Sequence, residues 1–290
     1  MKLSCLCVVL TAVSAGLGGC REATPSPAAA TVPLYESLGT LHRPVTASAP
    51  AQKYFDQGLR LTYAFNHEEA VRAFREAQRL DSSCTMCAWG EALALGPNIN
   101  APMDSPAGVA AYAAMARARR LAASAPEAER AFVEALSPRY AEVPPASRAS
   151  LDSAYAIAMR ALADRYPQDV DAQALAAEAL MDLSPWHYWE ADGSPRAATP
   201  EIVARLEAAL ALSAEHPGAC HFYIHAVEAK HPERAVACAE RLAATMPGAG
   251  HLVHMPAHIY IRVGRWADAI EANRHAVHAD DVLLRDASLD

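Results

Sequence analysis

A short phrase that returns after thirty residues restricts what this chain can fold into. Residues 217–221 read PGACH, and residues 247–251 read PGAGH. Ala235 and Ala269 likewise stand 34 residues apart. Self-similarity at a period of about 20 to 50 residues is typical of stacked units that bury their apolar faces against one another. We therefore expect a repeat protein, or solenoid, with a core drawn out along its axis.

The composition favours helices within each unit. Of the 290 residues only 7% are aromatic, and alternating runs of β-branched residues are few. This combination is typical of helical proteins. The sequence therefore predicts an all-α fold.

The predicted repeat domain covers residues 51–290. In its first unit, large and small residues alternate in the order that lets two antiparallel helices interlock: Tyr54, Gly58, Ala70, Phe74 and Ala77. This 34-residue pattern resembles a tetratricopeptide repeat (TPR). Residues 264–269 (GRWADA) resemble the turn of that repeat, and the resemblance covers roughly residues 51–281. It implies a right-handed helical solenoid of antiparallel hairpins.

The N-terminus predicts export. Residues 1–19 read as a secretory signal peptide, with Lys2 before an apolar run and small residues at its end. Residues 17–20 (LGGC) resemble the lipobox of bacterial lipoproteins, in which the chain is cut before the cysteine and that cysteine is acylated. The alternative is an ordinary cleaved signal with an incidental Cys20. The lipoprotein interpretation predicts a lipidated Cys20 and a flexible tether over residues 20–50, on a bacterial cell-envelope protein facing the periplasm. Leu34, Tyr35 and Leu38 could lay part of this tether on the folded domain.

Two internal stretches and the histidine-rich end are also similar to one group of bacterial TPR-containing lipoproteins. The stretches are residues 63–67 (YAFNH) and 89–100 (WGEALALGPNIN). The resemblance implies a membrane-attached repeat protein and no assigned activity.

Charge and cysteine usage narrow the possibilities further. Without residues 1–19 the chain has 24 of its 25 basic side chains and 33 acidic ones, which gives a formal charge of −9. This negative charge argues against a nucleic-acid partner.

Cys84 and Cys87 would lie about 5 Å apart on a helical turn, so they could form a disulfide. A hairpin folded about residue 231 would place residue 242, and not Cys238, opposite Cys220. We therefore expect Cys220 and Cys238 to be buried and unpaired.

Seven of the twelve histidines lie between residues 216 and 258. His221, His225 and Glu228 are spaced by four and three residues, which places them on one side of a helix. Three further histidines are spaced by three and four residues on the next predicted first helix: His251, His254 and His258. In TPR proteins the first helices line the concave surface, so the resemblance implies that both rows face one groove.

Such a grouping is what a divalent transition metal, zinc or copper, binds. Neutral imidazoles at helical spacing supply nitrogen ligands, and Glu228 supplies a balancing charge. Pro256 lies inside the second row, where it could kink the helix and rotate the histidines out of register. Without a metal, the same side chains would stabilise the helix stack or bind an acidic peptide.

An aromatic insertion, residues 184–200, accompanies the histidines. Its Trp186 and Trp189 either contact the ligand of the groove or form a packed cap over the core. Both interpretations stay open.

These patterns lead to one leading hypothesis and one alternative. No nucleophile motif, phosphate-binding loop or metalloprotease signature is present, so the sequence predicts no catalytic residue. The leading hypothesis is a membrane-tethered binding or scaffold protein whose groove recognises a protein, a peptide or a small ligand. The alternative is a metal-binding protein or metalloenzyme that uses the five histidines. The predicted groove residues are His221, His225, Glu228, His251, His254, His258, Trp186 and Trp189.

Overall fold

The computed structural model describes residues 32–286, so the signal peptide and Cys20 lie outside the described residues. Within this part the fold is all-α, as predicted, with thirteen α-helices and three short 3-10 helices. None of the described helices is both long and apolar enough to cross a lipid bilayer. The α-helices are α1 (Ala49–Tyr63), α2 (His67–Leu80), α3 (Thr85–Ala94), α4 (Ser105–Ala122), α5 (Glu127–Leu136), α6 (Ala149–Arg165), α7 (Val170–Met181), α8 (Thr199–Leu212), α9 (Pro217–Val227), α10 (Val236–Thr245), α11 (Gly250–His254), α12 (Pro256–Arg262) and α13 (Trp266–Asp286). The 3-10 helices are η1 (Glu36–Leu38), η2 (Ser137–Arg139) and η3 (Pro232–Ala235).

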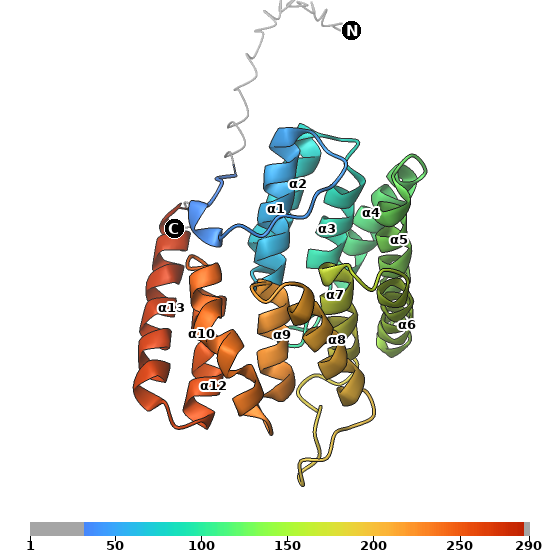
Figure 1. The fold of residues 1–290 in the computed structure, drawn as a ribbon. Helices are drawn as coiled ribbons and strands as arrows, with labels where there is room; N and C mark the ends of the chain where they lie inside the picture. Colours follow the sequence, from blue (N-terminus) through green and yellow to red (C-terminus); the bar gives the residue numbers. More distant parts are fainter. Residues whose placement is uncertain (1–31, 287–290) are drawn as a thin grey trace, which may run out of the picture. The chain divides into compact units, whose positions relative to one another are not determined.

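Successive helices pack as antiparallel hairpins, the arrangement predicted from the repeats (Figure 1). In the first hairpin, Gly58 of α1 faces Phe74 of α2, and a Cβ at Gly58 would lie 2.8 Å from the phenyl ring. Ala70 and Ala77 of α2 are fully buried. Small side chains therefore allow the close approach of these two helices, and the predicted repeat register is confirmed in this hairpin.

The first helices of two hairpins lie in the interior, whereas the first helix of the last hairpin, formed by α11 and α12, carries partly exposed histidines beside a cavity. Every residue of α3 and of α9 is buried. The C-terminal end of α1 meets the N-terminal end of α9, where a Cβ at Gly218 would lie 2.2 Å from the Tyr63 ring. Hairpins that are distant in sequence thus pack against one another. The histidines on α9 are consequently part of the core.

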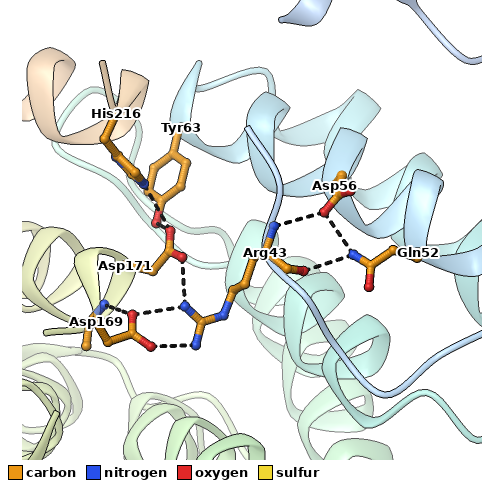
Figure 2. Close-up of polar contacts among 8 residues, drawn as sticks. Arg43, Gln52, Asp56, Tyr63, Asp169, Asp171 and His216 are labelled. Atoms are coloured by element: carbon orange, nitrogen blue, oxygen red, sulfur yellow. Dashed lines mark hydrogen bonds and ion pairs between the residues drawn. The ribbon is translucent and has the colours of Figure 1, made fainter. Parts of the chain in front are cut away.

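Residues 32–48, within the predicted tether over residues 20–50, lie against the helices, and Tyr35 and Leu38 of this segment are buried whereas Leu34 is exposed. Figure 2 shows the main anchor: the Arg43 guanidinium donates to the carboxylates of Asp169 and Asp171, at 2.7 to 2.9 Å. The sequence did not indicate the Arg43 anchor, because it is a single side chain without a repeating pattern. The folded unit therefore begins before the first repeat.

Asp171 also holds the start of α9. Its Oδ1 accepts a hydrogen bond from the Tyr63 hydroxyl at 2.5 Å and lies 3.1 Å from His216 Nε2. His216 Nδ1 accepts from the Ala219 backbone N–H and caps the first turn of α9, so His216 Nε2 carries the proton and donates to Asp171. The network in Figure 2 therefore links residues 32–48, through α7, to the helix that carries the first row of histidines.

Both cysteine pairs in the described part are joined as disulfides. The Cα atoms of Cys84 and Cys87 lie 5.3 Å apart. Cys220 and Cys238 are buried, as predicted, but they are also paired, with Cα atoms 5.2 Å apart, which corrects the expectation of free thiols. Because α9 ends at Val227, the chain reverses earlier than predicted and brings Cys238 opposite Cys220.

Candidate functional site: a histidine cluster

Six side chains predicted to share one site come from two neighbouring hairpins. His221 and His225 lie on α9, and Glu228 directly follows the end of that helix. These three are buried, whereas the remaining histidines are partly exposed. The remaining three lie on the broken helix formed by α11 and α12: His251, His254 and His258. The structure brings both rows together.

Pro256 breaks this helix without separating its histidines. α11 ends at His254, and α12 begins at Pro256. The His258 backbone N–H still donates to the Met255 carbonyl at 3.1 Å, so the turn between them is preserved. His254 Nε2 and His258 Nε2 lie 2.9 Å apart. The loss of register that Pro256 could have caused does not occur.

Three of the histidines converge in the buried half of the cluster. His221 Nε2 and His251 Nε2 lie 3.0 Å apart. Together with His225 they offer three ring nitrogens that all lie within 4.8 Å of one another. Such a spacing is close enough for one small ion to contact all three after modest side-chain adjustment.

The proton positions of two rings follow from their neighbours. His221 Nδ1 lies 2.7 Å from the Tyr63 carbonyl oxygen, and His254 Nδ1 lies 2.7 Å from Asn273 Oδ1. The amide of Asn273 is oriented because its Nδ2 donates to the Ala269 carbonyl. Both acceptors lack a proton, so Nδ1 of each ring is the protonated nitrogen. In the neutral ring, Nε2 then carries a free lone pair.

Glu228 fixes two more rings in the same way. Its Oε1 lies 3.2 Å from His225 Nδ1, and its Oε2 lies 3.0 Å from His258 Nδ1. Burial raises the pKa of Glu228, but hydrogen bonds from His225 and His258 outweigh burial and lower the pKa to about 2. The ionised carboxylate accepts from both rings, and Arg262 Nε, at 3.3 Å, donates to Oε2 as well. Carboxylate–histidine pairs of this kind orient metal ligands in many proteins.

His225 Nε2 is the one ring nitrogen of this cluster that is buried with no hydrogen-bond partner. His225 also belongs to the group in which one ring nitrogen each of His221, His225 and His251 lie within 4.8 Å of one another. Leaving a buried acceptor unpaired costs about 1 to 3 kcal/mol, so such atoms are rare unless a ligand completes them. An electron-pair acceptor at this point would satisfy His225.

The buried rings are held in the neutral form that binds metals. Burial lowers the pKa of His221 well below its usual value, and the neighbouring imidazoles lower it further. Burial also lowers the pKa of His225, although Glu228 opposes this, and it lowers the pKa of His251 to about 3. At neutral pH these rings therefore need no deprotonation before they bind a cation.

Phe65 is a residue of this site that the sequence analysis did not single out. It occupies the turn between α1 and α2 with a positive φ of 55°. Its ring lies 4.4 Å from the His221 ring, stacks on His225 at 6.4 Å and lies 5.5 Å from His251, measured between centroids. Residues 63–67 were noted only for a family resemblance. The backbone angle that turns Phe65 inward leaves no local signal in a non-glycine residue.

The two tryptophans of the insertion play different parts. Trp186 lies edge-on to the His225 ring at 4.9 Å, and its Nε1 donates to the Ile99 carbonyl. Trp189 contacts His231 instead, and its Nε1 donates to the Ala226 carbonyl near the end of α9. Trp186 thus covers the cluster, while Trp189 holds the insertion against the helix.

Two cavities give access to the cluster. The larger, of about 570 Å³, is lined by His251 and His254 together with Phe65. The smaller, of about 370 Å³, is lined by His225, His258, Glu228, Trp186, Trp189 and Arg262, among others. A small molecule or ion can therefore reach the histidines through these cavities.

Comparisons with known proteins found solved structures of low similarity. No protein-family model matches the chain, and no curated protein matches its sequence. Similar solved structures include TTC0263, a thermophilic TPR protein in Thermus thermophilus, with 13% identity and a TM-score of 0.41 over 82% of this chain and 97% of that one. The MamA protein has 10% identity and a TM-score of 0.37, over 80% and 92%. The MamA RS-1 ArsTM double mutant has 10% identity and a TM-score of 0.37, over 82% and 98%.

Proposed function

We propose that this chain binds a transition metal ion, zinc or copper, through Nε2 of His221, His225 and His251. The observation that carries the proposal is the buried Nε2 of His225, which has no hydrogen-bond partner although His225 belongs to a group of three histidines with nitrogens within 4.8 Å of one another. Two nitrogens bound to one ion lie about 3.0 to 3.4 Å apart. The 3.0 Å between His221 Nε2 and His251 Nε2 fits that spacing.

The surrounding residues support a metal more than a peptide ligand. His221 and His225 are buried and neutral, which is the ligand form, and the Tyr63 carbonyl and Glu228 hold their Nδ1 protons. Three protein nitrogens leave one coordination position for water or a small molecule. The cavities beside the cluster could admit such a molecule.

Calorimetric titration of the metal-free protein with Zn²⁺ and with Cu²⁺ tests this proposal. Wild-type protein is expected to bind tightly, and His225→Ala is expected to lose more affinity than the about 10- to 100-fold that changes outside the ligand set cost. His251→Ala, at a partly exposed position, serves as a second variant in case His225→Ala is unstable. His275→Ala on α13, outside the cluster, is the matched control. Equal binding by His225→Ala, His251→Ala and the control would refute the proposed ligand set.

We also propose that Cys20 anchors the chain to a membrane, on the strength of the LGGC sequence at residues 17–20. Fractionation of cells that produce Cys20→Ala tests this. The variant should leave the membrane fraction or accumulate unprocessed. A processed Cys20→Ala protein that stays with the membrane would contradict lipid anchoring.

Protein binding is a second candidate function, favoured by one exposed surface. Hairpin scaffolds present helix faces to partners, and α13 carries four exposed apolar side chains: Trp266, Ile270, Val277 and Leu284. At about 100° per residue they fall within about 40° of one another around the helix. We propose that an apolar helix face of a protein partner covers this stripe.

Site-specific photo-crosslinking in the producing cell tests the stripe. A photoreactive residue at Ile270 should crosslink to a defined protein, whereas one at Ile157 on α6, which is equally exposed and apolar, should not. Equal crosslinking from both positions would contradict a specific surface on α13.

A further inference from the structure

We infer that the cluster holds two metal ions, and that Nε2 of His254 and Nε2 of His258 bind the second one. The inference rests on the proposed function, because it places this ion beside the first. The two Nε2 atoms lie 2.9 Å apart, close to the about 3.0 to 3.4 Å expected for two nitrogens on one ion. The cluster thus contains a second nitrogen pair with the same spacing as that of His221 and His251.

The hydrogen bonds around this pair leave two lone pairs facing each other. His254 Nδ1 is protonated because it faces the oriented oxygen of Asn273. His258 Nδ1 is protonated because it faces the Glu228 carboxylate. In two neutral rings both Nε2 atoms are then acceptors, and two acceptors at this distance repel. The contact therefore needs a cation, which is either one shared proton or a metal ion.

The second position is next to the first and distinct from it. The group of His221, His225 and His251 includes neither His254 nor His258, and a second group of possible ligands, His225, Glu228 and His258, adjoins it through His225. The ring centroids of His225 and His258 lie 5.3 Å apart, and those of His251 and His254 lie 6.2 Å apart. Two-metal sites hold their ions about 3.5 to 4 Å apart with a shared oxygen ligand, which suits neighbouring rings at this spacing.

Glu228 joins the two positions. Its Oε1 faces His225, which belongs to the first, and its Oε2 faces His258, which belongs to the second. Two cations so close repel each other, and Arg262 adds a further positive charge at Oε2. The carboxylate offsets part of that charge. A hydroxide ion, which enters as water from the 570 Å³ cavity lined by His251 and His254 and loses a proton to solvent, would supply further negative charge.

The stoichiometry of metal binding tests this inference. Metal-free protein is loaded with Zn²⁺ or Cu²⁺, freed of excess by gel filtration and analysed for bound metal per chain. Wild type should retain two ions, and the double variant His254→Ala with His258→Ala should retain one. Cu²⁺-loaded wild type should also show magnetic coupling between two ions in its paramagnetic resonance spectrum, and the double variant should not. His254→Gln is a milder second variant, and thermal unfolding checks that each variant folds.

The outcomes separate this inference from the proposed function. One ion in wild type and one in the double variant would overturn the second position, assign a shared proton to the His254–His258 pair and leave the first position intact. One ion in wild type and none in the double variant would overturn the two-ion inference and the proposed first ligand set, because the single ion would then depend on His254 and His258. No ion in either protein would refute metal binding as a whole.

Discussion

At the scale of single residues, the cluster depends on a few side chains that fix the direction of others. Phe65 is held at a positive φ, a conformation that costs a non-glycine residue on the order of 1 to 3 kcal/mol and that persists only when packing enforces it. Its ring packs against the rings of His221 and His225. Glu228 acts through hydrogen bonds to two rings at once.

Glu228→Gln tests this double role. The amide offers one oxygen where the carboxylate offers two, so it can accept from His225 or from His258 but not from both. We expect metal affinity to fall by about 10- to 100-fold, because one ring loses its orientation. Competition with a coloured chelator measures the change.

Glu207→Gln is the control for that experiment. Glu207 accepts hydrogen bonds from Tyr223 and Arg234 and lies outside the cluster. Unchanged affinity in Glu228→Gln would show that the carboxylate does not orient the ligands.

At the scale of elements, α2 begins with a histidine whose surroundings disfavour its protonated form. His67 is the first residue of α2, where the helix dipole disfavours positive charge. Burial, and then the positive charge of Arg139, lower its pKa to about 4. Asn98 Nδ2 lies 3.4 Å from its Nε2, in the arrangement of a donor facing a neutral ring.

The low pKa of His67 predicts a loss of stability in acid. The unfolded chain takes up this proton near pH 6.5 and the folded chain only near pH 4, so the unfolded state binds more protons between these values. The free energy of unfolding should therefore fall as the pH decreases from 6.5 to 4, by about 2 to 3 kcal/mol from this group. His67→Gln removes the titration. Denaturant unfolding at both pH values should show a smaller loss for His67→Gln than for wild type, and equal losses would exclude this origin.

The elements also show what the sequence can and cannot predict. The repeat period and the order of small and large residues are local signals, and they were enough for the hairpins and for the two histidine rows. The inward turn of Phe65 and the docking of Arg43 on Asp169 and Asp171 depend on single contacts between distant segments. Such contacts have no period to detect. The Cys220–Cys238 disulfide was not predicted for a related reason. When a hairpin reverses a few residues earlier than expected, each residue of one helix faces a different residue of the other.

At the scale of the whole described unit, the cluster connects parts of the chain that are remote in sequence. The turn after α1 supplies Phe65, α9 supplies the first row of histidines, and α11 with α12 supplies the second (Figure 1). Residues 32–48 hold α7 through Arg43, and Asp171 carries that connection to α9 (Figure 2). An ion bound at the cluster would therefore stabilise the packing of several hairpins together.

The contact between Arg43 and Asp171 has a consequence for how the chain acquires its structure. It spans 128 residues, and the hydrogen bond between His221 and the Tyr63 carbonyl spans 158. Hairpins of neighbouring helices can form early, because their contacts are local, whereas contacts of such long range form slowly. We therefore expect the N-terminal segment to dock only after α7 has formed and packed. The histidines meet their partners on the first hairpin later still, so the site is among the last features of the molecule to assemble.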